Sequence, residues 1–253
     1  MQTLKLVLNT ANFILSLLVT LAMCAAGLFS VYALWDNHQV YRTADNVQAS
    51  MLRLKPQPET TAAQPSFAEL LAINPDVCAW LALEGTNIDY PVLQGETNLS
   101  YINTDVYGRF ALAGSIYLDS RNSRDFADTF LLLYGHHMEN SQMFGDLDKY
   151  RSQTFLQQHN TGTLLLPDGS YTLQVFACLL AAASDERFYQ PLQWQAENIC
   201  PLLDSVQQEA LCVQPETLAA LRMEEHPKIL CMSTCSNDFT DARTVVLAAV
   251  QPG

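Results

Sequence analysis

Near its N-terminus this chain has a run of 30 residues without a formal charge, between Lys5 and Asp36. Residues 11–35 of this run are almost wholly apolar, and Tyr32 and Trp35 stand at its far end. About 20 apolar residues in a helix cross a bilayer, whereas the hydrophobic part of a secretory signal has about 7–15. Aromatic rings favour the bilayer interface. The run therefore predicts a single retained transmembrane helix, ahead of a cleaved signal sequence or a buried core helix.

Charge leaves the orientation of this helix open. Lys5 and the amino terminus lie on one side of it, and Arg42 lies close on the other. Cytoplasmic flanks usually carry the excess of Lys and Arg, and here the two flanks are nearly tied.

After the apolar run the composition changes twice. Residues 36–54 carry spaced apolar positions among polar ones, which predicts a moderately amphipathic helix leaving the membrane. Residues 55–65 contain three prolines and small polar residues, a composition typical of a semi-rigid linker. We therefore expect a tip and transmembrane helix over residues 1–35, a stalk over 36–65 and a globular domain over 66–253.

The expected domain is strongly acidic. The chain has a net charge of −13, and from residue 66 onward it has 23 Asp and Glu against 9 Lys and Arg. A phosphate backbone is bound through Lys and Arg, so no nucleic-acid partner is expected. The acidity indicates a soluble, self-repelling surface, with recognition of a basic partner as the alternative.

Seven cysteines are scattered along the chain without a C-x-x-C pair. A disulfide framework is typical of small secreted domains with little core, so it fits this chain poorly. No zinc-ligand spacing is present in the sequence either. We therefore expect neither a metal nor a cofactor.

Strand-like runs outnumber helix-like ones after residue 66. The expected strands are residues 87–94, 115–119, 129–134, 162–166, 171–180, 228–234 and 243–250. The expected helices are residues 67–73, 142–158, 193–208 and 216–224. Several short strands with few long helices are typical of a β-barrel. The expected fold class is mainly β, a closed or nearly closed barrel with helices packed outside it.

One cysteine stands at the end of a predicted strand. In that strand Cys231 and Cys235 share a face about 13 Å apart, and a disulfide needs Cα atoms within about 7 Å. A polar loop then leads to Arg243, which opens the next strand. If the two strands pair as a hairpin, Cys235 and Arg243 lie nearly opposite each other. A guanidinium there can stabilise a thiolate and an oxyanion, or it can simply pair with Asp238 or Asp241.

A cysteine nucleophile also needs an acid/base partner, usually a histidine. His136 and His137 follow the apolar strand 129–134 and Gly135, where a buried strand opens into a loop. Catalytic groups are often held in such places by a rigid scaffold. On spacing alone, a plain surface turn and a metal role for this pair stay open as alternatives.

Two short motifs and one arginine stand out together: Tyr134-Gly-His-His-Met138, Cys231-Met-Ser-Thr-Cys235 and Arg243. They resemble the Tyr-Gly-His-Asn/His-Met motif, the Thr-Leu-x-Thr-Cys motif and the downstream arginine of class B sortases, which are Gram-positive cell-surface transpeptidases. Cys231 and Met232 depart from the second motif, whereas Thr234 and Cys235 keep it.

Further matches to this family follow the same order along the chain. Residues 74–81 resemble its opening helix and turn, 85–94 an early strand, and 114–122 the strand and turn before the histidine. Met143, Phe144, Leu147 and Tyr150 resemble the class B pattern after the histidine. The resemblance covers residues 67 to 250 or so, and the membrane anchor before them.

The resemblance implies an eight-stranded sortase β-barrel with peripheral helices, a cytoplasmic N-terminus and an extracellular catalytic domain. It implies that Cys235 is the nucleophile, that His136 is the general acid/base and that Arg243 is the oxyanion partner. Positions in the family's substrate groove are matched by Ser233, Thr234 and Asn98.

The implied reaction is cleavage of a C-terminal sorting signal after Thr, through a thioacyl enzyme. The implied partners are secreted proteins that bear such a signal, and an amine of the peptidoglycan cross-bridge or of lipid II that accepts the cleaved protein. Three alternatives stay open: pilin polymerisation through a lysine, a membrane-tethered cysteine peptidase that hydrolyses the thioester, and a non-catalytic module that only binds sorting peptides.

Overall fold

The computed structural model describes residues 2–56 and 67–253. The described residues fall into two compact units, one up to Arg42 and the other from Thr43 onward. Most of the predicted linker, residues 57–65, lies outside the described residues.

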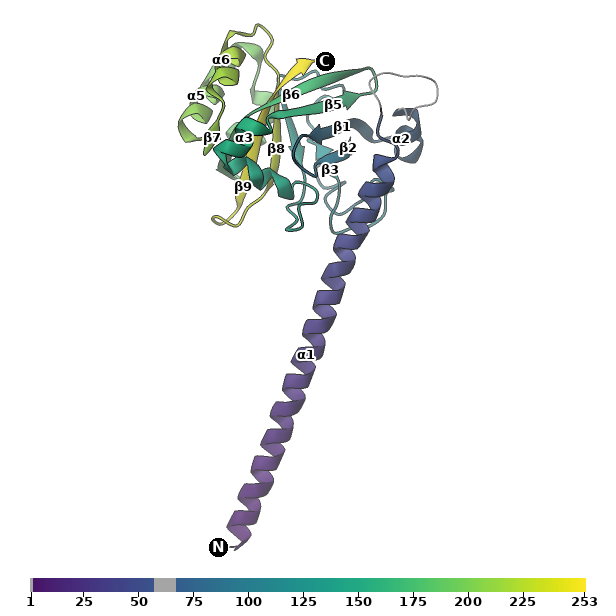
Figure 1. The fold of residues 1–253 in the computed structure, drawn as a ribbon, viewed down its shortest axis with the longest axis vertical. Helices are drawn as coiled ribbons and strands as arrows, with labels where there is room; N and C mark the ends of the chain where they lie inside the picture. The colour runs from purple at the N-terminus through teal and green to yellow at the C-terminus, as the bar shows by residue number, and fades with distance from the viewer. Residues whose placement is uncertain (1, 57–66) are drawn as a thin grey trace. The chain divides into compact units, whose positions relative to one another are not determined.

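A single long helix, α1 (Gln2–Leu52), begins the chain (Figure 1). It contains no proline that would interrupt the hydrogen-bond ladder. The stretch Lys5–Leu52 is long and apolar enough to cross a membrane, with a mean hydropathy of 2.3 in its most apolar window. Large apolar side chains on its N-terminal part, such as Leu6, Phe13 and Trp35, are exposed. A helix that is apolar on all sides is typical of a membrane span, so the predicted transmembrane helix fits α1.

The last turns of α1 belong to the second unit. Met51 is buried, and it packs with half-buried Val47 and Leu54 in a cluster that also includes Phe67 and Trp80. The apolar positions of the predicted amphipathic stalk are thus buried against the domain that follows it.

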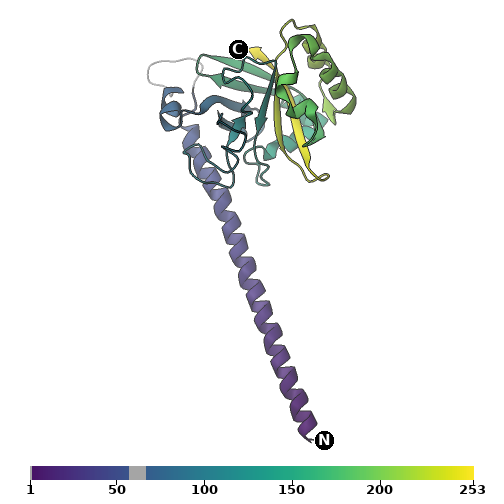
Figure 2. The ribbon, with the colours of Figure 1, turned by 180° about the vertical axis from the view of Figure 1, so that it is seen from behind.

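Nine strands are found in the described residues, and eight of them close a barrel (Figures 1 and 2). Their order is β5-β1-β2-β3-β4-β8-β9-β6, and β6 pairs with β5 to complete the circle. The strands are β1 (Val77–Leu83), β2 (Asp89–Leu93), β3 (Ile116–Leu118), β4 (Phe130–Tyr134), β5 (Thr161–Leu166), β6 (Gly169–Ala182), β7 (Cys212–Val213), β8 (Ile229–Cys235) and β9 (Ala242–Pro252). The two-residue β7 adds to β6 outside the barrel. The expected eight-stranded barrel is confirmed.

All seven expected strands are present, but two strands were not expected. Residues 74–81, which resemble the family's opening helix and turn, contain a turn and then the first residues of β1, which starts at Val77. Six of the seven β1 residues are buried, since β1 lies between β2 and β5 and is covered on both faces. A strand buried on both faces lacks the alternating pattern that marks a strand in sequence.

Short helices surround the barrel. They are α2 (Phe67–Ile73), η1 (Gly145–Arg151), α3 (Gln153–Gln158), α4 (Glu186–Tyr189), η2 (Pro191–Gln193), η3 (Ala196–Asn198), α5 (Cys200–Glu209) and α6 (Pro215–Met223). The expected single helix 142–158 is two helices. Ser152 is extended between them, and its hydroxyl caps α3 by accepting from the Phe155 N–H at 3.4 Å.

One hydrophobic cluster lies between the barrel wall and α4, α5 and α6. Phe176 and Leu179 of β6 pack there with residues of α5 such as Leu202 and Val206, all of them buried. The wall formed by β4, β8, β9 and β6 is therefore fixed from outside, and β4, β8 and β9 carry the candidate site at their ends.

Candidate active site

Cys235 and Arg243 are direct partners across the antiparallel pair β8–β9. Opposed residues in such a pair have Cβ atoms about 4.5–5.5 Å apart. Cys235 is exposed at the end of its strand, and Arg243 is half-buried with Nη1 donating to the Ala242 carbonyl at 3.0 Å. The predicted opposition of these two residues is confirmed.

A short polar loop makes the turn between the two strands. The Ser236 N–H donates to the Ala242 carbonyl at 2.9 Å, and Asp241 adopts a positive φ of 59°. Asp238 pairs with Arg151, Nη2 to Oδ2 at 2.9 Å. The alternative that Arg243 pairs with Asp238 or Asp241 is wrong, since no such ion pair is found among the described residues.

All seven cysteines lie in the described part of the chain, and each is a free thiol. Only Cys24, Cys200 and Cys235 are exposed. Burial raises the pKa of the Cys78 and Cys178 thiols to about 12, so these two are protonated and unreactive at neutral pH. Of the cysteines in the barrel domain, Cys235 combines exposure with a cationic neighbour.

His136 begins the loop that follows β4. β4 runs parallel to β8 with Tyr134 opposite Ser233, and the Gly135 N–H donates to the Ser233 carbonyl at 3.3 Å. The last pair of this register lies two residues before His136 on one strand and two residues before Cys235 on the other. Residues His136, Cys235 and Arg243 therefore stand at the ends of three adjacent strands.

Gly135 is required where this loop begins. A Cβ there would lie 2.4 Å from Cδ1 of Ile116 and 2.8 Å from the Phe144 ring. The half-buried His136 ring then places Nε2 2.6 Å from the Ile102 carbonyl. A carbonyl only accepts, so Nε2 carries a hydrogen and Nδ1 is the nitrogen that can exchange a proton in the neutral ring.

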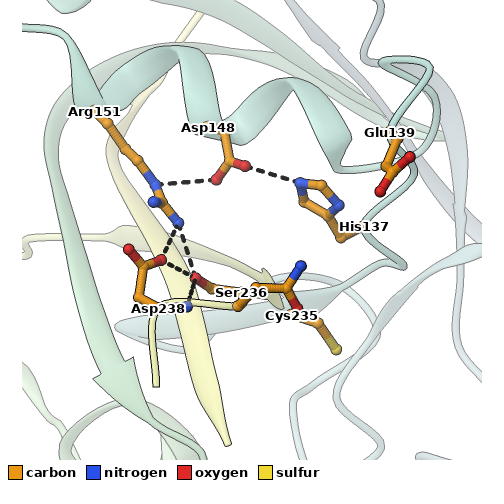
Figure 3. Close-up of a pocket in the computed structure, with 8 residues that line it drawn as sticks. His137, Glu139, Asp148, Arg151, Cys235, Ser236 and Asp238 are labelled. Carbon is orange, nitrogen blue, oxygen red and sulfur yellow. Dashed lines mark hydrogen bonds and ion pairs between the residues drawn. The ribbon is translucent and has the colours of Figure 1, made fainter. Parts of the chain in front are cut away.

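His137 has a different partner from His136. Its Nε2 lies 2.8 Å from Oδ2 of Asp148, and this hydrogen bond raises the pKa of His137 above its usual value, against the effect of burial. In Figure 3 the sulfur of Cys235 points away from the His137 ring. The described residues include no group of three or more His, Cys, Asp or Glu that could hold a metal ion, so the metal alternative for the histidine pair has no support.

A cavity of about 470 Å³ opens beside Cys235 (Figure 3). It is lined by His137, Glu139, Asp148, Arg151, Cys235, Ser236, Asn237 and Asp238. His136 and Arg243 are not among its lining residues, so Cys235 is the one proposed catalytic residue that lines this cavity.

Of the three residues matched to the substrate groove, Ser233 and Asn98 have side-chain hydrogen bonds within the protein and Thr234 has none. Ser233 is buried, with its Oγ 2.8 Å from the Tyr189 hydroxyl. Thr234 is buried, and its Oγ1 has no hydrogen-bond partner among the described residues. Asn98 donates to Asp119 at 2.9 Å and accepts from the Ser120 N–H at 2.7 Å.

Three tyrosines near the site were missed by the sequence reasoning. The Tyr134 ring lies 5.3 Å from that of Tyr117 and 6.4 Å from that of Tyr189. Burial, and then the charges of Asp119 and Cys235, raise the pKa of Tyr117 to about 12. Tyr134 stands in the Tyr134-Gly-His-His-Met138 motif and Tyr117 lies within the predicted strand 115–119, but neither pattern marks these residues as part of a row of tyrosines.

A buried carboxylate holds the tyrosine row in place. Asp119 is fully buried, accepts from the Tyr134 hydroxyl at 3.0 Å and pairs with Arg121 at 2.7 Å. Burial would raise the pKa of Asp119, but the hydrogen bonds from Arg121 and Asn98 outweigh it and lower the pKa. Asp119 is thus a permanent anion that orders one wall of the site.

No protein-family model matches the chain. Among curated proteins it is 30% identical to sortase B of Staphylococcus aureus over 189 residues, which is 74% of this chain and 75% of that protein. A solved Streptococcus pyogenes class B sortase, Spy0129, described as involved in pilus biogenesis, superposes with a TM-score of 0.66 at 34% identity. That match covers 73% of this chain and 97% of the other. The Staphylococcus aureus sortase B–substrate complex gives a TM-score of 0.66 at 27% identity, covering 86% of this chain and 96% of the other.

Proposed function

This chain belongs to the class B sortases, which are cysteine transpeptidases, and we propose that it cleaves C-terminal sorting signals after Thr and joins the cleaved protein to a peptidoglycan amine. The observation that carries the proposal is the direct opposition of Cys235 and Arg243 at the ends of β8 and β9, with His136 leaving the end of the adjacent β4. A thiol, a guanidinium and an imidazole on three adjacent strand ends are the parts that acyl transfer needs.

In the first step the Cys235 thiolate attacks the Thr carbonyl of the sorting signal. The tetrahedral intermediate has a negative oxygen, and Arg243 is the donor next to the nucleophile that stabilises it. His136, as imidazolium, gives its proton to the leaving amine. The C–N bond breaks and the Thr carbonyl remains on Cys235 as a thioester.

In the second step an acceptor amine attacks the thioester. Neutral His136 takes a proton from this amine, and Cys235 leaves as a thiolate. The products are a new amide and the enzyme in its starting protonation state. Attack by an amine gives transpeptidation, whereas attack by water gives hydrolysis. The supply of an acceptor amine therefore decides which product forms.

The test uses the full chain in detergent micelles with a library of Thr-containing peptides. We expect cleavage after Thr that depends strongly on an added cross-bridge peptide amine, with a new amide product seen by mass spectrometry. Hydrolysis at the same rate without an amine would favour the tethered peptidase. Peptide binding without any cleavage would favour the non-catalytic module.

Pilus assembly is the second candidate function. The similarity to Spy0129, at 34% identity, favours it because that protein is a class B sortase involved in pilus biogenesis. The same assay separates the two candidates. A peptide with a blocked N-terminus and one lysine would be the better acceptor if the chain joins pilins, and a cross-bridge peptide if it anchors proteins to the wall.

The proposed topology has the N-terminus in the cytoplasm and the barrel outside the cell. We assign residues 1–35 to the tip and transmembrane helix, 36–65 to the stalk and 66–253 to the catalytic domain. The apolar α1 and the family's action on the cell surface support this assignment. Protease added to intact protoplasts should remove the barrel and leave a membrane-bound fragment, whereas full protection would reverse the orientation.

A further inference from the structure

Two charged residues of η1, Asp148 and Arg151, contact the chain neighbours of all three proposed catalytic residues (Figure 3). These neighbours are His137, which follows His136, Ser236, which follows Cys235, and Thr244, which follows Arg243. The contacts join segments 85 and 93 residues apart in the chain.

Asp148 connects the histidine loop to β9. Its Oδ2 lies 2.8 Å from Nε2 of His137, and its Oδ1 accepts from the Thr244 hydroxyl at 2.9 Å. Burial would raise the pKa of Asp148, but the hydrogen bonds from His137 and Thr244 and the charge of Arg151 lower it. Asp148 is therefore a carboxylate over the pH range in which the enzyme can work.

Arg151 connects η1 to the loop that follows the nucleophile. Its Nη2 donates to Oγ of Ser236 at 2.9 Å and to Oγ1 of Thr244 at 2.6 Å, and it pairs with Asp238 at 2.9 Å. Its Nε lies 3.1 Å from Oδ1 of Asp148, so the two residues act together. The guanidinium thus lies against Asp148 through Nε and against Ser236, Thr244 and Asp238 through Nη2, a span that the single nitrogen of a lysine does not cover.

The helix that carries the pair is firmly attached to the barrel. Leu147 and Tyr150 of η1 are fully buried. Asp146 is buried as well, accepts from the Asn87 N–H at 2.8 Å and pairs with Lys149 at 2.8 Å. The loop 236–241, by contrast, is largely exposed. Asp148 and Arg151 thus attach an exposed loop to a rigid support.

We propose that Asp148 and Arg151 are a pair of positioning residues, which align Cys235, His136 and Arg243 by holding the residue after each of them. The proposal rests on the proposed function for the roles of those three residues. Neither member of the pair is a catalytic residue, because each acts through a neighbour of the reacting groups. A displacement of 1 Å in such a site costs about 10²-fold in rate, so holding the neighbours has a measurable effect.

The experiment uses the full chain in detergent micelles with the variants Arg151→Gln, Asp148→Asn and Arg151→Lys. The matched control is Arg222→Gln. Arg222 and Arg151 have similar exposed fractions, 26% and 28%, and Arg222 pairs with Asp204 between α6 and α5 at 2.6 Å. Exposed ion pairs contribute little to stability, so all four variants should stay folded in thermal unfolding.

The first measurement is the rate at which Cys235 is acylated by a substrate peptide, chosen from those that the wild type cleaves. We expect kcat to fall about tenfold or more in Arg151→Gln and Asp148→Asn, with KM changed less than about twofold. The kcat of Arg151→Lys should lie between those of the wild type and Arg151→Gln, because an ammonium replaces only part of the contacts. A double variant that combines Arg151→Gln with Asp148→Asn should have a kcat no lower than that of the slower single variant, since the two residues act as a unit. The control should match the wild type.

The second measurement needs no peptide substrate. With Cys24 and Cys200 replaced by alanine, Cys235 is the remaining exposed cysteine, and its alkylation by iodoacetamide is followed against pH. We expect Arg151→Gln to slow alkylation at neutral pH and to change its pH profile, and the Arg222→Gln control to do neither. Equal rates and profiles in all of these proteins would overturn the positioning role.

The outcomes separate this proposal from the proposed function. If the wild type turns over peptide and the Arg151 and Asp148 variants keep its kcat, the positioning role is wrong and the function stands. The positioning role is also contradicted if these variants change only KM, or if their loss of activity is proportional to the fraction of unfolded protein. If Cys235→Ala is as active as the wild type, the proposed function itself fails, and the alkylation measurement still decides the positioning role.

Discussion

Cys235 and Arg243 face each other as the last pair of the β8–β9 register, so the proposed nucleophile and the proposed oxyanion donor are held by the same hairpin. The hairpin is flanked by β4 on one side and β6 on the other, and both strands contribute to the hydrophobic cluster under α4, α5 and α6. A donor held this way needs little reorganisation when charge develops on the substrate, which is what electrostatic catalysis requires.

Replacing Arg243 should therefore affect the rate and not the fold. We expect Arg243→Ala to lower kcat by about 10²–10³-fold, because one oxyanion donor is lost. Arg243→Lys should recover part of the rate. The acylation rates of both variants are measured in a single turnover with a substrate peptide that the wild type cleaves. An Arg243→Ala variant with wild-type kcat would remove this residue from the mechanism.

Replacing His136 should slow acylation much more than replacing the adjacent His137. His136→Ala should slow acylation by about 10²–10⁴-fold through loss of the acid/base group. His137→Gln should lose less than about tenfold, because the glutamine amide can still donate to Asp148. The same kinetic assay on the two variants makes each the control of the other. If His137→Gln proves the more damaging change, the assignment of roles must be exchanged.

The stability of the domain should depend on pH through His137. The Asp148 hydrogen bond raises the pKa of His137, so the folded state binds its proton more tightly than the unfolded state does. This contribution is fully present below the ordinary histidine pKa of about 6.5 and is lost as the pH rises through the raised value. The difference in unfolding temperature between the wild type and His137→Gln should therefore be largest in mild acid and shrink toward alkaline pH. A difference that grows with pH would contradict the pairing.

The last turn of α1 should contribute to the stability of the barrel domain. Met51 has an exposed fraction of 1%, whereas Met223 on α6 has one of 87%. Met51→Ala should lower the free energy of unfolding by about 2–5 kcal/mol, and Met223→Ala should change it by less than about 0.5 kcal/mol. Denaturant titration of both variants in the same detergent gives the comparison. Equal effects would show that α1 does not support the domain.

Much of the barrel could be predicted because its strands are short apolar runs bounded by polar turns. The opposition of Cys235 and Arg243 followed from the same pattern, since a strand, a loop and a returning strand are local in sequence. β1 was missed because it is apolar at nearly every position, and such a run carries no period. The break of residues 142–158 into two helices depends on a single serine cap, which a helical pattern does not show.

The contacts around the site were less predictable, because they join residues far apart in the chain. The Thr244–Asp148 hydrogen bond spans 96 residues, and the Asn98–Asp119 contact spans 21. No local pattern marks Asp148 or Arg151 as different from other charged residues on a short helix. Their partners depend on how η1 packs against the barrel, and that is decided by the tertiary structure.

The central claim, that Cys235 forms the acyl enzyme, is tested most directly by the intact mass of the full chain during turnover of a cleaved peptide. A thioester adduct on Cys235 should accumulate without an acceptor, disappear when an amine is added and be absent in Cys235→Ala. An adduct that persists in Cys235→Ala, or turnover with no adduct on any cysteine, would contradict it.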